Sequence, residues 1–454
     1  MKKHSIWTRE FGKSVVSIAL PISLQSLITI GVNMIDNIMV GSLGENAISG
    51  ASLSNQFFNL FYIACMGLAM GGSIMTARYW GSDDHFSLKK TVSLVLRICS
   101  VLALLFTMVT ALFPQGIMRL YTNDTEVIAQ GVLYLKWQIP CYLFFGLSLT
   151  CTNLLRSVGQ VKIPLYSSIG AFAIKAVMNY GLIFGNLGMP ALALEGAAIS
   201  TMLARCFEFL FICGYFILFD RKIAYRWKDF TQKYRSVIRE YINVGMPVFC
   251  SDVIMAVANT LLAMIMGRIG KSFISAYSIT TVTLQFSTVL LQGLSNAACI
   301  LTGHTLGKGD APGTVRQTRA FLLLALAVGF LASATILVIK DGIIGLYNIT
   351  DETRSNANQL MYAISIFVVF QAMNYVLSRG ILRGGGDTRF LMASDAVFLW
   401  TLSIPLAYLS GLVWKSSAFT VYALINVDLV CKTVLCLFRL RSGKWMKKIN
   451  RVDA

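Results

Sequence analysis

The stretch VGSLGENAISGASL at residues 40–53 returns later in the chain as MGRIGKSFISAYSI at residues 266–279. The two stretches lie 226 residues apart, and the same offset pairs Pro21 with Pro247. Further along, LLRSVGQVK and ILRGGGDTR correspond at an offset of 227. A constant spacing with Gly and Pro in register indicates that the chain is an internal duplication.

The composition places this duplicated chain in a membrane. Of its 454 residues, 56% are hydrophobic and only 13% are charged, which is more apolar sequence than a single soluble domain buries. Apolar runs of about 20 residues or more predict transmembrane helices. We predict twelve of them, at residues 14–40, 47–77, 91–113, 131–155, 163–187, 194–219, 241–266, 273–303, 318–344, 357–382, 389–412 and 417–440.

Each half of the chain holds six of these spans. An even number returns the chain to its starting side, so both halves share one orientation and are related by a pseudo-twofold axis along the membrane normal. We therefore predict an all-α integral membrane protein with twelve transmembrane helices in two pseudo-symmetric six-helix lobes around a central cleft. The N-lobe is expected at residues 1–220, a basic cytoplasmic linker at 221–240, and the C-lobe with a basic tail at 241–454. Such an arrangement is typical of transporters.

The net charge of +18 would suggest nucleic-acid binding in a soluble protein. Here roughly 29 of the Lys and Arg residues fall on the side that holds both termini, as the positive-inside rule predicts for cytoplasmic loops. We expect a multi-pass protein of the plasma membrane with both termini cytoplasmic and no nucleic-acid partner. The dense basic segment 221–240 is interpreted as a positive-inside anchor, with binding of anionic lipid or nucleic acid as the alternative.

Asp36 stands inside the first predicted span, where a carboxylate is costly unless it is paired or hydrated. On a helix it shares about one third of the circumference with other polar residues, among them Asn33 and Asn37. A carboxylate at this depth can exchange a proton for Na+ or for a cationic substrate. The alternative is a permanently protonated Asp36 with a structural role.

The second half has acids of its own, Asp252 and Asp395. Under the repeat Asp252 corresponds to Ser26, so the halves do not share their ionisable groups. The site that couples ion and substrate is therefore expected in either lobe. Two other charge pairs are interpreted as structural, Arg205 with Glu208 and Asp428 with Lys432, because their spacing places them on one helix face.

Substrate-binding residues are expected among the polar and aromatic side chains of the spans. Aromatic and thioether groups in a cleft would suit flat, lipophilic cations. The candidates are Asn33, Asn37, Asn55, Asn59, Asn153, Tyr277 and Gln285.

No nucleotide site is predicted. GRIGKS at residues 267–272 resembles a phosphate-binding loop, but the Walker pattern requires a glycine where this chain has Ile265. We find no clustered His, Asp or Glu for a membrane enzyme or a firm metal site, so no enzymatic activity and no cofactor are expected. An ion gradient, of H+ or Na+, remains as the energy source.

The chain resembles the multidrug and toxic compound extrusion (MATE) family over nearly its whole length. The resemblance rests on the order of ALPISLQSL, MIDNIMVGSLG, LLRSVGQVKIP, NYGLIFGNLGMPALALEGAAIST, ILRGGGDTRF and VYALINVDLVCKTVLCLFRLRSGKW. It implies alternating access and export of organic cations in exchange for H+ or Na+. By position it assigns Asp36, Asn179 and Thr201 to an N-lobe cation site, and Asp252 and Asp395 to C-lobe positions where many members have acids.

Lys175 departs from the family pattern, since relatives often have Asn there. Its ammonium group, four residues before Asn179, would occupy the place of Na+ near Asp36, which favours H+ coupling or a coupling site at Asp252 and Asp395. The closest rival function is a flippase for lipid-linked or amphipathic substrates, whose cleft should be strongly basic. Membrane lipids are the expected surroundings, and the two lobes make a functional monomer plausible.

Overall fold

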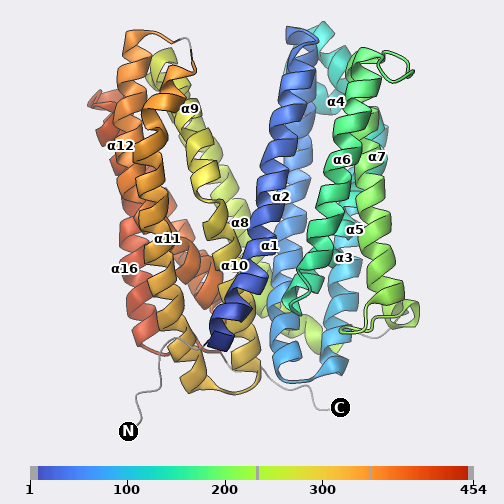
Figure 1. Ribbon diagram of the computed structural model, residues 1–454, viewed down its shortest axis with the longest axis vertical. Coiled ribbons are helices and arrows are strands. Elements are labelled where there is room, and N and C mark those ends of the chain that lie inside the picture. The colour runs from blue at the N-terminus through green and yellow to red at the C-terminus, as the bar shows by residue number, and fades with distance from the viewer. Residues whose placement is uncertain (1–8, 232–234, 348, 448–454) are drawn as a thin grey trace. The chain divides into compact units, whose positions relative to one another are not determined.

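The computed structural model describes residues 9–231, 235–347 and 349–447, and the regular structure in these ranges is helical throughout. Figure 1 shows the chain as long rods. The elements are α1 (Arg9–Gly41), α2 (Glu45–Gly81), α3 (His85–Leu112), α4 (Pro114–Arg119), α5 (Thr125–Ser157), α6 (Lys162–Phe184), α7 (Ala193–Gly214), η1 (Tyr215–Phe219), η2 (Trp227–Thr231), α8 (Arg235–Ile269), α9 (Lys271–Ser287), α10 (Val289–Gly307), α11 (Ala311–Gly345), α12 (Asp351–Asn374), η3 (Tyr375–Leu382), α13 (Thr388–Phe398), η4 (Leu399–Ser403), α14 (Ile404–Tyr408), η5 (Leu409–Val413), α15 (Ala418–Ile425) and α16 (Val427–Arg441).

The duplication predicted from the sequence is confirmed by where the helices begin. The starting residues of α1 and α8, α2 and α9, α3 and α11, α5 and α12, and α6 and α13 are each 226 residues apart. The repeated aspartates have a structural task, since Asp84 and Asp310 accept a hydrogen bond from the third backbone N–H of α3 and α11 respectively. Such N-caps satisfy backbone donors that a helix leaves unpaired.

Eleven helical runs in the described residues are long and apolar enough to cross a membrane. The remaining predicted span, the eighth, at 273–303, is a pair of helices, α9 and α10, bent by 49° at Thr288. The all-helical membrane fold is thus confirmed, and the sequence pattern missed the bend because hydropathy is insensitive to a single non-helical residue.

The described chain divides into two compact units. One contains the beginning of α1 up to Ser23, the segment Ala77–Asp83 and the chain from Ile242 onward; the other contains Leu24–Thr76 and Asp84–Tyr241. In the first unit α12 packs against α9, α11, α15 and α16, and Figure 1 shows it beside α11. In the second unit α7 packs against α5 and α6. The lobe boundaries expected from the sequence stay a prediction.

One close helix contact explains a repeated glycine. Gly81 ends α2 and Gly307 ends α10, and they are 226 residues apart. A Cβ atom on Gly81 would lie 2.2 Å from the carbonyl oxygen of His304, and one on Gly307 would lie 2.2 Å from that of Arg78. Only glycine allows the two backbones to approach this closely.

The basic segment 221–240 is only partly a loop, and residues 232–234 lie outside the described ranges. Its first part docks against α3, where Ser93 contacts the hydroxyl of Tyr225 at 3.1 Å and donates to the carbonyl of Asp229 at 2.7 Å. Burial raises the pKa of Tyr225 to about 12, which keeps its hydroxyl protonated. Lys89 adds an ion pair to Asp229 at 3.2 Å.

Candidate functional site

Asp36 lies on α1 and is buried, with 9% of its surface exposed. Its Oδ2 atom is 3.2 Å from the ammonium nitrogen of Lys175, and its Oδ1 atom accepts a hydrogen bond from Asn179 Nδ2 at 3.1 Å. Lys175 and Asn179 are four residues apart on α6 and therefore share one face. Both carboxylate oxygens thus have polar partners.

A second layer of polar groups surrounds this pair. Ser200 on α7 donates to Asn179 Oδ1, which orients the amide so that its nitrogen points at Asp36. The neighbouring Thr201 hydroxyl instead donates to the carbonyl of Ala197 at 2.9 Å. Ser200, which the sequence analysis did not single out, is thus the residue of α7 that contacts Asn179, and the assignment of Thr201 to the cation site stays a prediction.

Tyr134 on α5 lies between Thr201 and Asn55, one of the predicted substrate-binding residues. Its side chain interacts with those of Thr201 and Asn55, and it is within electrostatic range of Asp36. Gln138, one turn further along α5, donates to Asn55 Oδ1 at 3.1 Å. Helices α1, α2, α5, α6 and α7 thus all contribute to one polar cluster around Asp36. The sequence contained no periodic signal that separated Tyr134 and Gln138 from ordinary core residues.

The other predicted substrate-binding residues do not join this cluster. Asn153 is buried and donates to the carbonyl of Leu149 and to the sulfur of Met66. Tyr277 is half-buried and packs on an apolar core in the unit formed by the later part of the chain. Exposed side chains belong to Asn33, Asn37, Asn59 and Gln285.

The acids of the second half form two separate ion pairs. Asp252 on α8 is 3.1 Å from Arg383, which follows η3 in the ILRGGGDTR segment. Asp395 on α13 pairs with Lys432 on α16 and accepts a hydrogen bond from Ser251.

The interpretation of Asp428 and Lys432 as a mutually neutralising pair is wrong, because the long Lys432 side chain reaches across to Asp395 on α13. The pairing of Arg205 with Glu208 is confirmed at 2.8 Å. An i, i+3 or i, i+4 spacing shows only which partners a helix itself offers, and a neighbouring helix can supply a better one.

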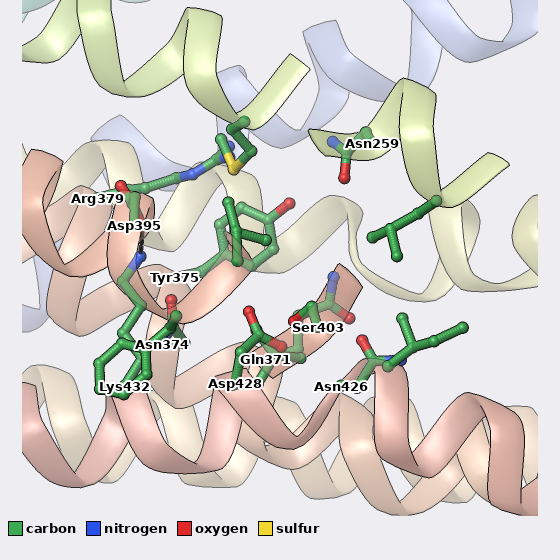
Figure 2. A pocket seen from close by; sticks show the side chains of 16 residues that line it. Asn259, Gln371, Asn374, Tyr375, Arg379, Asp395, Ser403, Asn426, Asp428 and Lys432 are labelled. Atoms are coloured by element: carbon green, nitrogen blue, oxygen red, sulfur yellow. Dashed lines mark hydrogen bonds and ion pairs between the residues drawn. The ribbon is translucent and has the colours of Figure 1, made fainter. Parts of the chain in front are cut away.

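A cavity of about 250 Å³ lies beside the Asp395–Lys432 pair, entirely within the unit that contains α8 to α16. Figure 2 shows its polar lining, including Asn374, Tyr375 and Arg379 from α12 and η3, and Asn426 and Asp428 from the last span. The π-helical turns η3 and η4 run along its wall, and such turns are frequent at functional sites. The sequence analysis did not predict this cavity.

Among the described residues, no three His, Cys, Asp or Glu side chains lie close enough together to hold a metal ion. At Asp36 the position opposite the carboxylate is taken by the Lys175 ammonium.

A duplicated membrane-helix fold with ionisable groups buried inside each half defines a multi-pass membrane transporter. The chain belongs to the MatE family, the multidrug and toxic compound extrusion transporters. The family's sequence model matches residues 21–181 and again 247–409, which are the two halves of the duplication.

Relatives cover nearly the whole chain. "Probable multidrug resistance protein NorM" of Thermotoga maritima is 23% identical over 97% of this chain and 94% of its own length. "Uncharacterized transporter YisQ" of Bacillus subtilis is 22% identical over 96% of this chain and 95% of its own length.

Solved structures share the fold. A chain described as an outward-facing multidrug resistance MATE family transporter of the MOP superfamily superposes with a TM-score of 0.86 at 16% identity, over 97% of both chains. A MOP superfamily transporter from Pyrococcus furiosus gives a TM-score of 0.85 at 17% identity, again over 97% of both chains. Its description states that reversed polarity of the binding pocket suggests a different function for that protein.

Proposed function

We propose that this protein is a secondary active transporter that exports organic cations from the cell in exchange for protons. The observation that carries the proposal is the buried Asp36–Lys175 pair, with both carboxylate oxygens engaged. The names of relatives that are multidrug resistance proteins support the substrate class. In this proposal both termini are cytoplasmic, the protein works as a monomer in the plasma membrane, and it needs no cofactor or nucleic acid.

The charge balance at Asp36 explains why proton and substrate would exclude each other. The carboxylate and the ammonium sum to zero, so a proton or an organic cation adds one positive charge to the cluster. With both bound, the carboxyl group is neutral, and the organic cation and the Lys175 ammonium remain as two uncompensated positive charges. Two like charges about 4 Å apart repel by about 4 kcal/mol at an effective dielectric constant of about 20, and every 1.4 kcal/mol is about a tenfold change in occupancy.

The same ammonium disfavours Na+ at this site. A sodium ion next to Asp36 would need several oxygen ligands, whereas Lys175 lies 3.2 Å from Oδ2. We therefore propose H+ rather than Na+ as the coupling ion.

The rival function, a flippase for lipid-linked substrates, has less support. Its cleft should carry an excess of basic groups to hold a pyrophosphate. The cavity of Figure 2 balances Arg379 and Lys432 against Asp395 and Asp428.

The test is efflux from proteoliposomes loaded with a fluorescent organic cation such as ethidium. An acidic exterior should accelerate efflux over protein-free vesicles, because protons entering down their gradient exchange for the cation. High external Na+ at equal pH should have no effect. Acceleration by Na+ alone would overturn H+ coupling, and no transport under either gradient would contradict drug antiport and favour the flippase.

A further inference from the structure

The cavity of about 250 Å³ is separate from Asp36, because it lies wholly within the other compact unit. Three irregularities of the helices converge on it. Its wall includes the π-helical turns η3 and η4, and Asn426, the residue between α15 and α16 at which the last membrane span is interrupted. Interrupted and widened helices in transporters are typical of ligand sites, because they free polar groups at the depth of the membrane.

The cavity is smaller than the ~300–1,000 Å³ of pockets that take drug-sized ligands. It therefore fits a small molecule better than a multi-ring drug. Polar and apolar groups share its lining about equally, and Asn259, Gln371, Asn374 and Asn426 are among the polar side chains (Figure 2). An apolar ligand would leave the amide nitrogen of Asn374 without a partner, which is costly in a buried site.

The charged groups of the lining form two poles. Lys432 is compensated by Asp395, with which it pairs. Asp428, on the first turn of α16, is only 8% exposed and forms no ion pair with any described residue. Arg379, from η3, contributes a guanidinium that also contacts the sulfur of Met255 at 3.3 Å and the ring of Tyr375 at 4.7 Å. Asp428 thus comes from α16 and Arg379 from η3, and Figure 2 shows them apart in the lining.

One buried amide points to an acceptor group on the ligand. Asn374 lines the cavity and is 7% exposed. Its Oδ1 accepts a hydrogen bond from Ser378 at 3.1 Å, whereas its Nδ2 has no partner among the described residues. A buried donor without a partner is costly, so a ligand oxygen that accepts a hydrogen bond from it would bind more tightly.

From these features we infer that the cavity binds a small zwitterion of the amino-acid class. Its carboxylate accepts from Arg379 and Asn374, and its ammonium group pairs with Asp428. Charge-assisted hydrogen bonds of this kind are the strong ones in a site shielded from water. Binding of the zwitterion in this cavity does not depend on exchange at Asp36. It would occur whether or not that exchange is the transport mechanism.

The test is isothermal titration calorimetry on the purified full-length protein with glycine, leucine and phenylalanine. At least one of them should bind. For the best binder, the amide derivative, which lacks the carboxylate, and the N-acetyl derivative, which lacks the ammonium, should each bind about tenfold more weakly or worse. If none of the three amino acids binds, the inference is wrong. If the amide derivative binds as tightly as the amino acid, the cavity is a cation site instead.

Variants separate the two poles. Asp428→Asn should lower affinity for the amino acid by about tenfold or more and leave that for the N-acetyl derivative unchanged. Asn374→Asp, which keeps the size of the side chain, should weaken binding of the amino acid while sparing the amide derivative. Asp341→Asn, at a side chain that is 76% exposed on α11, serves as the matched control and should bind like wild type. A loss of equal size in all three variants would overturn the assignment.

Discussion

Asp36→Asn is expected to reduce pH-gradient-driven efflux of a fluorescent organic cation to the leak of protein-free vesicles. Asparagine has the size of aspartate and can still accept a hydrogen bond from Asn179, but it leaves the buried Lys175 ammonium unpaired, so the thermal unfolding midpoint of the variant is measured alongside its transport. It can neither bind a proton nor pair with a cation, and the exchange is lost. The measurement is the initial rate of efflux from proteoliposomes with equal amounts of reconstituted protein.

Two variants serve as controls for this result. Glu208→Gln removes another, half-buried carboxylate of the same unit, one that pairs with Arg205 on its own helix, and should keep most of the gradient-driven transport. Asp252→Asn removes the acid that pairs with Arg383 in the other unit, and it too should still respond to the gradient. Loss in Asp252→Asn with retention in Asp36→Asn would move the coupling site to the second half of the chain.

The second large effect concerns stability. Lys175→Met should destabilise the fold by about 3–5 kcal/mol, because removing one partner of a buried ion pair leaves the other charge without compensation. The Lys175 and Asp36 side chains are only 13% and 12% exposed, so solvent screens the remaining carboxylate poorly. Combining Lys175→Met with Asp36→Asn should restore most of the lost stability, since no unpaired charge remains. The measurement is the thermal unfolding midpoint of the purified protein in detergent.

The control is Lys340→Met, which breaks an ion pair whose acidic partner, Asp341, is 76% exposed. Exposed pairs contribute little, so its unfolding midpoint should stay near that of wild type. A Lys175→Met variant as stable as wild type, or a double variant less stable than Lys175→Met alone, would contradict the assignment of Lys175 as the counter-ion of Asp36.

Most of the fold could be predicted because its determinants are local. Apolar runs define the spans, and the 226-residue repeat predicts that helices start in pairs, as Thr125 and Asp351 do. The bend at Thr288 and the break at Asn426 escaped prediction, since a polar residue in a long apolar run is compatible with an unbroken helix.

The candidate site was only partly predictable. The polar residues that share one face of the first span identified Asp36, and the departure from the family pattern identified Lys175 as a positive charge near it. In the structure the Lys175 ammonium nitrogen lies 3.2 Å from the Asp36 carboxylate. The ion-pair partner of a long side chain depends on tertiary packing, which the sequence does not show. The pairing of Lys432 with Asp395 was therefore not predicted. Likewise Ser200 and Thr201 are adjacent in sequence, and only the rotation of α7 decides which of them contacts Asn179.

Mutual exclusion of proton and substrate at Asp36 is tested most directly by proton release on binding. Purified protein in weakly buffered detergent solution is titrated with the fluorescent cation, and an indicator dye follows the pH at a pH where the site is protonated. Wild type should release about one proton for each cation bound, and Asp36→Asn should release none. Cation binding by wild type without proton release, or equal release from Asp36→Asn, would contradict the exchange.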